Sequence, residues 1–245
     1  MSVASSAGVR RVLTLAAFVA TYMQGVNISI PNAALPHMQG TLSMADDEIG
    51  WIFASYVTAG MVVLPMTRWL AGRLGRRTLL LGSVVLFIIG LLLDARAETC
   101  GQLILARVVQ GAASGPIGPL ALAVLHDVSP PARHARIGLA STACMLFGIS
   151  SGPPIGGWLS EYHGWPAIFL ASLPLAGFVL LVMALWLPER RAAENPPFDF
   201  VGLAAFSLGI VGLQLLLDRG SVWSGSPRPR FGRRPPPPRW AFTFS

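Results

Sequence analysis

Residues 103–125 read LILARVVQGAASGPIGPLALAVL, an apolar run that contains one charged side chain, Arg107. A helix needs about 20 predominantly apolar residues to cross a hydrocarbon layer that is about 30 Å thick. The run therefore predicts a transmembrane helix. An ionisable side chain inside such a helix costs about 2.5–3.5 kcal/mol on insertion scales, so Arg107 is expected to have a partner or a functional role. The alternative is that Arg107 extends its charge to the nearby membrane interface.

Two glycines share a helix face with Arg107, because Gly111 and Gly115 follow it at intervals of four residues. A glycine has no side chain, so a second helix can approach closely on that face. We therefore expect a neighbouring backbone to lie beside the cation.

The rest of the chain repeats the apolar pattern of residues 103–125. Of its 245 residues, 53% are hydrophobic and 12% are charged, whereas a soluble domain carries roughly 25% charged residues. Lipid offers no partner for backbone polar groups, so spanning runs of this kind are helices. The sequence predicts an all-α membrane protein with seven spans: Val12–Ile30, Ile49–Met66, Leu79–Leu93, Leu103–Leu125, Ile137–Leu159, Ile168–Leu187 and Val201–Leu217.

The arginines predict the orientation of these spans. The net charge is +7 and all 18 basic residues are arginine; such a charge can indicate nucleic-acid binding, but here the arginines gather in alternate loops. Cytoplasmic loops carry an excess of basic residues, so the pattern predicts a cytoplasmic N-terminus in a lipid bilayer and no nucleic-acid partner. The basic loops hold Arg10, Arg11, Arg68, Arg73, Arg76, Arg77, Arg133, Arg136, Arg190 and Arg191; the opposite loops hold Asp46, Asp47, Glu48, Asp94, Arg96, Glu98 and Glu161.

A second glycine pattern lies in the predicted fifth span, which reads GISSGPPIGG from Gly148. Gly148, Gly152 and Gly156 form a stripe that permits tight contact between helices, and Pro153 and Pro154 remove backbone donors and bend the helix. A smooth stripe with a bend suits a sliding or rocking interface; the alternative is generic helix packing. The GISSG stretch also fits a nucleophile elbow, but it lies in an apolar helix with no strand before it, so it does not predict an enzyme.

Two further features are less specific. Gln24 and Asn27 lie on adjacent turns of the first span and can present amides to a central cavity. The alternative is a role in hydrogen bonds between helices, which are worth about 0.6 kcal/mol on average. Between the second and third spans, Gly72 and Gly75 allow a tight turn, and the neighbouring arginines hold the loop in the cytoplasm.

Together these motifs resemble the major facilitator superfamily, and within it the fourteen-span drug:proton antiporters of the EmrB/QacA type. The fourth-span motif of that family is similar to Arg107, Gln110 and Gly111, and its fifth-span antiporter motif looks like Gly148 to Gly157. Further matching segments are Gly72 to Arg77 for the loop after the second span, Asn27 to Pro36 for the first span, Glu48, Trp51 and Tyr56 for the second, and Phe198 to Gly220 for the seventh.

The resemblance implies a six-helix N-terminal transporter bundle in residues 1–190, followed by a linker and a seventh transmembrane helix in residues 191–220. It implies proton-coupled export of drug-like small molecules across the bacterial inner membrane, driven by the proton gradient, with no cofactor and no metal. A periplasmic adaptor and an outer-membrane channel are the implied partners. The implied site residues are Arg107 for proton coupling; Gln24, Asn27 and Gln110 lining the cavity; Gly148, Gly152, Pro153, Pro154, Gly156 and Gly157 as an antiporter hinge between bundles; and Gly72, Arg73, Gly75, Arg76 and Arg77 in the cytoplasmic loop motif.

Three features depart from the family pattern. The branch usually has an aspartate where Asn27 stands, and an amide cannot bind and release a proton. Arg68 and Gly72 occupy loop positions where the family carries a glycine and an acid. The family also has a second bundle, whereas residues 221–245 are a Pro- and Arg-rich stretch that we expect to be disordered. The sequence thus leaves open a truncated, transport-inactive membrane fragment, or a module that binds lipid or a partner through its basic tail.

Overall fold

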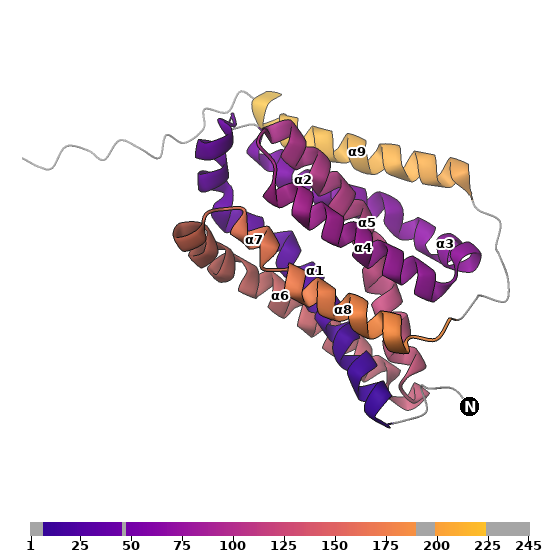
Figure 1. Ribbon diagram of the computed structural model, residues 1–245. Helices are drawn as coiled ribbons and strands as arrows, with labels where there is room; N and C mark the ends of the chain where they lie inside the picture. The colour runs from indigo at the N-terminus through magenta and orange to yellow at the C-terminus, as the bar shows by residue number, and fades with distance from the viewer. Residues whose placement is uncertain (1–6, 46–47, 190–198, 224–245) are drawn as a thin grey trace, which may run out of the picture.

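The computed structural model describes residues 7–45, 48–189 and 199–223 (Figure 1). The described residues form helices joined by short connections, with no strand among them. The basic stretch 221–245 was expected to be disordered. Its residues 221–223 belong to the last helix, and residues 224–245 lie outside the described residues. The helices are α1 (Ala7–Leu42), α2 (Ile49–Val63), α3 (Thr67–Leu74), α4 (Arg76–Ala95), α5 (Cys100–Asp127), α6 (His134–His163), α7 (Ala167–Leu170), α8 (Leu173–Trp186) and α9 (Phe200–Trp223), with 3₁₀ turns at Leu64–Met66 and Pro131–Arg133.

Within the described residues, five helical segments are long and apolar enough to cross a membrane: Ala7–Leu42, Ile49–Leu74, Arg76–Ala95, Cys100–Asp127 and Ala167–Trp186. They correspond to the first four predicted spans and the sixth. The predicted fifth span is the 30-residue helix α6, which is rich in glycine and serine and is not among the five. The predicted seventh span lies in α9, where Phe200–Gln214 is an apolar stretch of the described residues.

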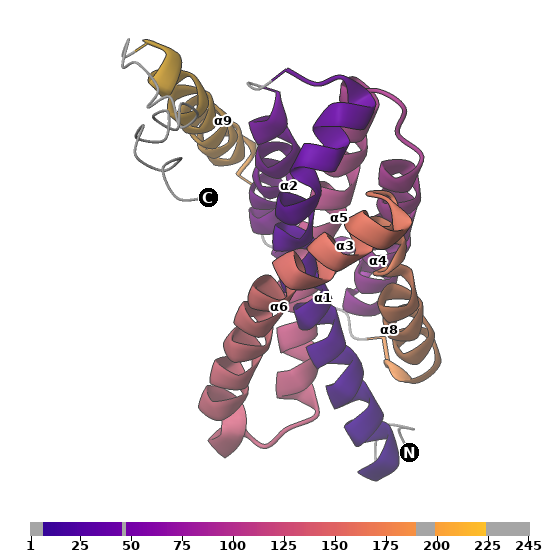
Figure 2. The ribbon, with the colours of Figure 1, turned by 90° about the vertical axis from the view of Figure 1, so that its left-hand side faces the viewer.

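Two helix pairs organise the bundle. The most extensive contact joins α1 to α6, and the next joins α2 to α5 (Figure 2). Helix α4 packs on α5 and α8, and α9 lies against α2 on the outside of the bundle (Figure 1). The core consists mainly of aliphatic and aromatic side chains from α1, α4, α5 and α8. This arrangement places α1 and α5 next to each other in the interior, where the polar residues described below meet.

Helix α6 has the reverse of the pattern expected in water. Its buried residues are small or polar, whereas its large apolar side chains face outward: Leu139 is 73% exposed and Phe147 is 67% exposed. An apolar face of this extent is normally covered in a soluble protein. The pattern is the one expected where the surroundings are lipid or another helical unit, because only the inner side then needs close packing.

Several helices run further than the sequence predicted, and α1 does so most, since it spans Ala7–Leu42 instead of Val12–Ile30. Helix α4 continues past Leu93 to Ala95 and so includes Asp94, which was expected in a loop. Helix α9 continues to Trp223, beyond the predicted end of the seventh helix at residue 220. In these helices the hydropathy of the sequence falls before the helix ends. A helix can continue through polar residues when neighbouring helices or a membrane interface supply partners for them.

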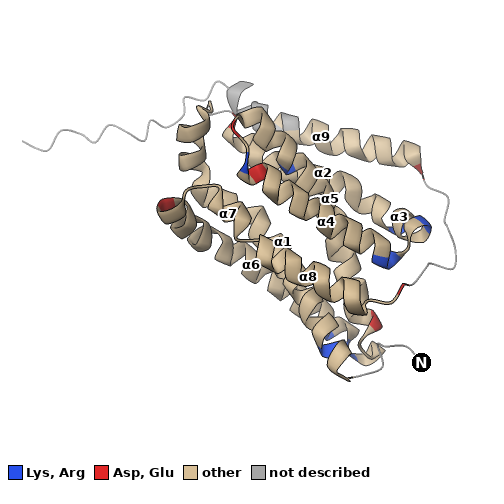
Figure 3. Ribbon diagram, in the orientation of Figure 1, with Lys and Arg blue, Asp and Glu red and all other residues tan. Residues whose placement is uncertain are grey.

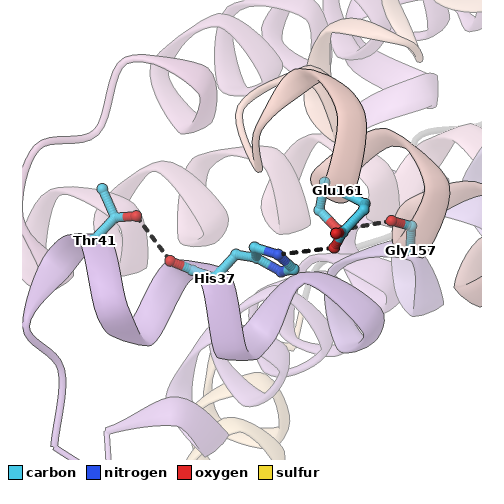
Figure 4. Close-up of polar contacts among 5 residues, drawn as sticks. His37, Thr41, Gly157 and Glu161 are labelled. Carbon is cyan, nitrogen blue, oxygen red and sulfur yellow. Dashed lines mark hydrogen bonds and ion pairs between the residues drawn. The ribbon is translucent and has the colours of Figure 1, made fainter.

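Charges separate toward the two ends of the bundle. Most arginines of the described residues lie at the end where the chain begins and where α3 meets α4 (Figure 3). At the opposite end, His37 of α1 and Glu161 of α6 approach to 3.5 Å between Nε2 and Oε2, with both side chains partly exposed (Figure 4). This contact ties the far ends of the α1–α6 pair together.

Candidate functional site

The polar centre of the bundle is built around Arg107, which lies in the first half of α5 and is 0% exposed. Its guanidinium donates from Nε to the Ile52 carbonyl of α2 at 3.3 Å, and from Nη2 to the Asn27 carbonyl of α1 at 3.2 Å. Nη1 donates to Oε1 of Gln110, one turn further along α5. The side chain therefore points into the protein, and the alternative in which it extends to the membrane interface is wrong.

Two aromatic rings complete the surroundings of the cation. The guanidinium carbon of Arg107 lies 4.4 Å from the ring centroid of Tyr56 in α2 and 5.7 Å from that of Phe169 in α7. A cation over an aromatic face is attracted by the ring, and by more when water is excluded. Within the described residues, no carboxylate lies within ion-pair distance of this guanidinium. Carbonyl dipoles, one amide and two rings therefore solvate the charge.

The glycines that follow Arg107 allow this cluster to form. A Cβ placed on Gly111 would collide with the backbone carbonyl of Tyr56, and one on Gly115 would lie 2.8 Å from the carbonyl of Gly60. Helices α5 and α2 therefore touch backbone to backbone beside the arginine. The expected close approach is confirmed, and it brings the Ile52 carbonyl within reach of the guanidinium.

Asn27 and Gln110 belong to the same network. Both are 0% exposed. Nε2 of Gln110 donates to Oδ1 of Asn27 at 3.2 Å, and Nδ2 of Asn27 donates to Oγ of Ser172, which precedes α8, at 3.0 Å. These two amides were expected to line a cavity, but in the structure they are enclosed. They satisfy each other and the arginine, so no cavity is needed to solvate them.

Gln24 is the one amide of the predicted set that lines a hollow. The hollow has a volume of about 310 Å³ between α1, α2 and α5, and Tyr56, Met61 and Met145 are among its other lining residues. Nε2 of Gln24 donates to the Ser114 carbonyl at 2.6 Å, so its amide crosses from α1 to α5. The hollow is largely apolar with a few polar groups, as small-molecule sites usually are.

Asp94 also lies in the interior, although its sequence context predicted a loop residue. Its carboxylate is 0% exposed, and neither oxygen has a hydrogen-bond partner among the described residues. It interacts electrostatically with Arg107 and Tyr56. Helical spacing was the available signal, because Phe87, Leu91 and Asp94 lie on one buried face of α4. The drop in hydropathy after Leu93 concealed it.

The glycine stripe of α6 packs against α1. A Cβ on Gly148 would collide with the Tyr22 carbonyl, and one on Gly156 would collide with the Ile30 carbonyl. A Cβ on Gly152 would meet the Ser29 hydroxyl, which itself donates to the Ile149 carbonyl at 2.7 Å. The stripe was expected between two bundles, but it lies inside this bundle, because α1 and α6 approach too closely there for any side chain. On the other side of α6, Pro153 and Pro154 are exposed, and Gly157 is half-buried near Ala33.

The loop motif turns at one glycine. Gly75, between α3 and α4, has φ +89°, whereas Gly72 is a buried residue inside α3. The expected turn is therefore confirmed at Gly75 alone. The arginines of the motif all have partners: Arg73 lies 4.5 Å from the ring centroid of Trp69, Arg76 pairs with Asp127 at 3.2 Å, and Arg77 donates to the Ala184 carbonyl.

The fold and the polar centre together define a membrane-type helical bundle organised around a buried cation. The family model of the Major Facilitator Superfamily matches residues 14–241. The chain therefore belongs to the Major Facilitator Superfamily, a class of transporters rather than enzymes, and the family predicted from the motifs is confirmed.

Curated relatives are bacterial multidrug proteins. The chain is 34% identical over 209 residues to the multidrug export protein EmrB of Haemophilus influenzae, covering 85% of this chain and 41% of the relative. It is 32% identical over 210 residues to EmrB of Escherichia coli K12, with the same two coverages. It is 33% identical over 211 residues to the putative multidrug resistance protein MdtD of Yersinia enterocolitica, covering 86% and 45%. The chain thus spans about two fifths of the length of the curated relatives it matches.

A solved structure supports the fold. The proton:xylose symporter XylE bound to 6-bromo-6-deoxy-D-glucose superposes with a TM-score of 0.65 at 15% sequence identity. The match covers 88% of this chain and 52% of the symporter. The described helices therefore have the architecture of half of a major facilitator.

Proposed function

We propose that this chain is one bundle of a bacterial inner-membrane exporter that moves drug-like molecules out of the cell in exchange for protons, with its N-terminus in the cytoplasm. The observation that carries the proposal is Arg107, a fully buried cation bonded to α1, α2 and α5. A charge placed there is costly, and a positioned intramembrane charge commonly marks an ion or proton pathway. The names of the multidrug relatives support the substrate class.

The hollow beside Gln24 is our candidate for the contribution of this bundle to substrate binding. Its wall combines the amide of Gln24 with apolar side chains, and two methionines, Met61 and Met145, lie in it. Methionine is flexible and polarisable, and it suits surfaces that accept differently shaped apolar molecules. Amphipathic compounds that combine an apolar body with one polar group fit this lining best.

The cluster also supplies a mechanical link for the proposed transport. Arg107 donates to the backbone carbonyls of Ile52 and Asn27, which belong to two different helices. A change in the charge near the guanidinium alters the strength of both bonds, so it shifts how α1 and α2 sit against α5. Rocking of one bundle against another around a central site is how transporters of this architecture alternate their access.

The experiment is gradient-driven uptake of ethidium into inverted membrane vesicles. Two preparations are compared: vesicles with this chain alone, and vesicles with this chain joined to the part of Escherichia coli EmrB that it does not match. An acidic vesicle interior is expected to drive dye uptake, a protonophore is expected to abolish it, and Arg107→Ala is expected to remove it. Arg136→Ala, at an exposed position in the first turn of α6, is the matched control. Dye uptake that does not depend on the proton gradient in either preparation contradicts the proposal.

The adaptor and the outer-membrane channel that the resemblance implies belong to the same proposal. They are tested separately, by cross-linking the chain in intact cells and identifying periplasmic proteins that co-purify with it. Recovery of only inner-membrane proteins would remove them from the proposal without affecting the transport claim.

A further inference from the structure

A buried acid lies beside the buried base. Asp94 sits in the last turn of α4, is 0% exposed, and has no hydrogen-bond partner for either carboxylate oxygen among the described residues. The guanidinium of Arg107 is close enough to interact with it electrostatically. Helices α4 and α5 also approach closely here, because a Cβ on Gly90 would lie 2.7 Å from Cβ of Gln110. The acid and the arginine network thus face each other across one helix contact.

An ionised carboxylate at this position is poorly stabilised by its own surroundings. Burying a charge without hydrogen bonds is expensive, and proteins relieve the cost by pairing the charge or by binding a proton. The C-terminal end of α4 adds a partial negative charge, which disfavours an anion. Arg107 is a nearby buried cation, and its donors already bond to Ile52, Asn27 and Gln110. Binding a proton is therefore one way to relieve the cost of burying the Asp94 carboxylate.

We propose that Asp94 is the proton-binding group of this bundle and that Arg107 senses whether it is charged. The inference rests on the proposed function, which it deepens by naming the residue that binds the proton. Asn27, on the other side of the arginine, carries an amide that cannot take up a proton. The carboxyl group that can do so comes from α4.

The groups that face Asp94 are few. Arg107 from α5 and Tyr56 from α2 interact with it electrostatically. Helices α7 and α8, which also pack on α4, contain no titratable residue. Arg76 and Arg77 lie at the opposite end of α4. Among the charged groups, Arg107 is thus the one that acts most strongly on Asp94.

The proton step is a simple exchange. One proton adds to one oxygen of the Asp94 carboxylate and gives a neutral carboxylic acid, and release of the proton restores the negative charge. When the acid is neutral, the positive charge of Arg107 is balanced only by carbonyl dipoles, the Gln110 amide and two rings. When it is ionised, the guanidinium is drawn toward α4 and away from its acceptors on α1 and α2. Proton binding thus changes the contacts of helices that carry no proton themselves.

An open hollow lies at the same end of the bundle as Asp94. It has a volume of about 890 Å³ and is lined by Leu93 and Ala95, on either side of Asp94, and by Ala106, next to Arg107. The hollow reaches the exposed residues Arg96 and Glu98. Water in this hollow would contact the residues that flank Asp94 and Arg107 in the sequence, and we propose that the proton enters from there.

The test is an infrared titration of the purified full chain in detergent, which requires no transport. The C=O stretch of a protonated carboxylic acid is followed as a function of pH in wild type, Asp94→Asn, Asp94→Glu and Glu161→Gln. Glu161 is the matched control, since it is an exposed acid that does not line the hollow. Asp94→Asn keeps the size of the side chain and removes only its proton chemistry, and size-exclusion chromatography verifies that each variant is folded.

We expect one carboxylic band to disappear in Asp94→Asn, to return at a shifted frequency in Asp94→Glu, and to remain in Glu161→Gln. An unchanged spectrum in Asp94→Asn overturns the inference. The vesicle assay keeps this result separate from the proposed function. A titrating Asp94 with no gradient-driven dye uptake sinks the antiport proposal and supports proton binding. Gradient-driven uptake that is fully retained in Asp94→Asn overturns the role of Asp94 and leaves the antiport proposal standing.

Discussion

At the scale of single residues, the centre of the bundle depends on the shape of a guanidinium as well as on its charge. Arg107 reaches three acceptors from three nitrogen atoms, two of them backbone carbonyls on other helices. Its planar group also lies over the ring of Tyr56. A lysine carries the same charge on one nitrogen and cannot reproduce this fork.

Arg107→Lys is therefore expected to be far from neutral. Buried acceptors left without a donor cost about 1–3 kcal/mol each, so the melting temperature in detergent should fall by several degrees, and dye uptake should drop by more than tenfold. Circular dichroism melting and the vesicle assay measure the two effects. Arg136→Lys, at an exposed position, serves as control, and equal behaviour of the two variants would contradict the prediction.

Gly75 has a backbone conformation that does not suit a residue with a side chain. Its φ of +89° and ψ of 148° lie in a region that is essentially restricted to glycine, and a Cβ there would collide with the carboxylate of Glu189. Such strain costs about 1–3 kcal/mol, so Gly75→Ala should unfold at lower denaturant concentration.

Gly82→Ala is the matched control for that measurement. Gly82 lies inside α4 with nothing within 4 Å of an added Cβ. An alanine in a helix interior is favoured over glycine by up to about 1 kcal/mol, so this variant should be as stable as wild type or more stable. A Gly75→Ala protein that matched it would show that the turn tolerates a side chain.

Some residues of the polar centre could be predicted from the sequence and others could not. A charge inside an apolar run is visible in a sequence, so Arg107 was identified from the pattern alone. Asp94 was not, because it follows the run instead of interrupting it, and hydropathy cannot report that a helix continues. The amides of Asn27 and Gln110 were identified as important, but a sequence does not tell whether a polar group faces a cavity or another polar group.

At the scale of elements, the contact between α1 and α6 is the most extensive one in the bundle. Gly25 of α1 and Gly148 and Gly152 of α6 bring the two backbones together, and a Cβ on Gly25 would collide with the Met145 carbonyl. The small-residue stripe and its spacing were predictable. Its partner was not, because the spacing of glycines marks a smooth face without naming the helix that covers it.

Gly152→Ala should separate this pair. The added Cβ would lie 2.9 Å from the backbone nitrogen of Ile30, and backbone cannot move aside as a flexible side chain does. Overpacking of this kind costs typically about 1–3 kcal/mol, which thermal denaturation in detergent measures. Gly138→Ala, in the first turns of α6 with nothing within 4 Å of an added Cβ, should leave the melting temperature unchanged. Equal loss in both would point to helix α6 in general instead of its contact with α1.

At the scale of the whole molecule, α6 presents an outward face of large apolar side chains, including Leu146 and Trp158. Most of the interior is complete without that face, since α6 contributes mainly small residues to it. The curated relatives are more than twice as long as the matched region. An outward apolar face of this kind needs lipid or another helical unit to cover it.

Orientation is the remaining property of the whole molecule that the charges predict. The arginine-rich end holds the start of α1 and the α3–α4 turn, and a basic excess on one side marks the cytoplasmic face. In a background of Cys100→Ala and Cys144→Ala, single cysteines are placed by Gly40→Cys, near the end of α1, and by Ala132→Cys, in the turn before α6. Both sites are exposed. A membrane-impermeant maleimide should label Gly40→Cys in intact spheroplasts and Ala132→Cys only after lysis. The reverse labelling pattern would invert the topology. It would also place the hollow near Asp94 on the cytoplasmic side, so protons would reach Asp94 from the cytoplasm.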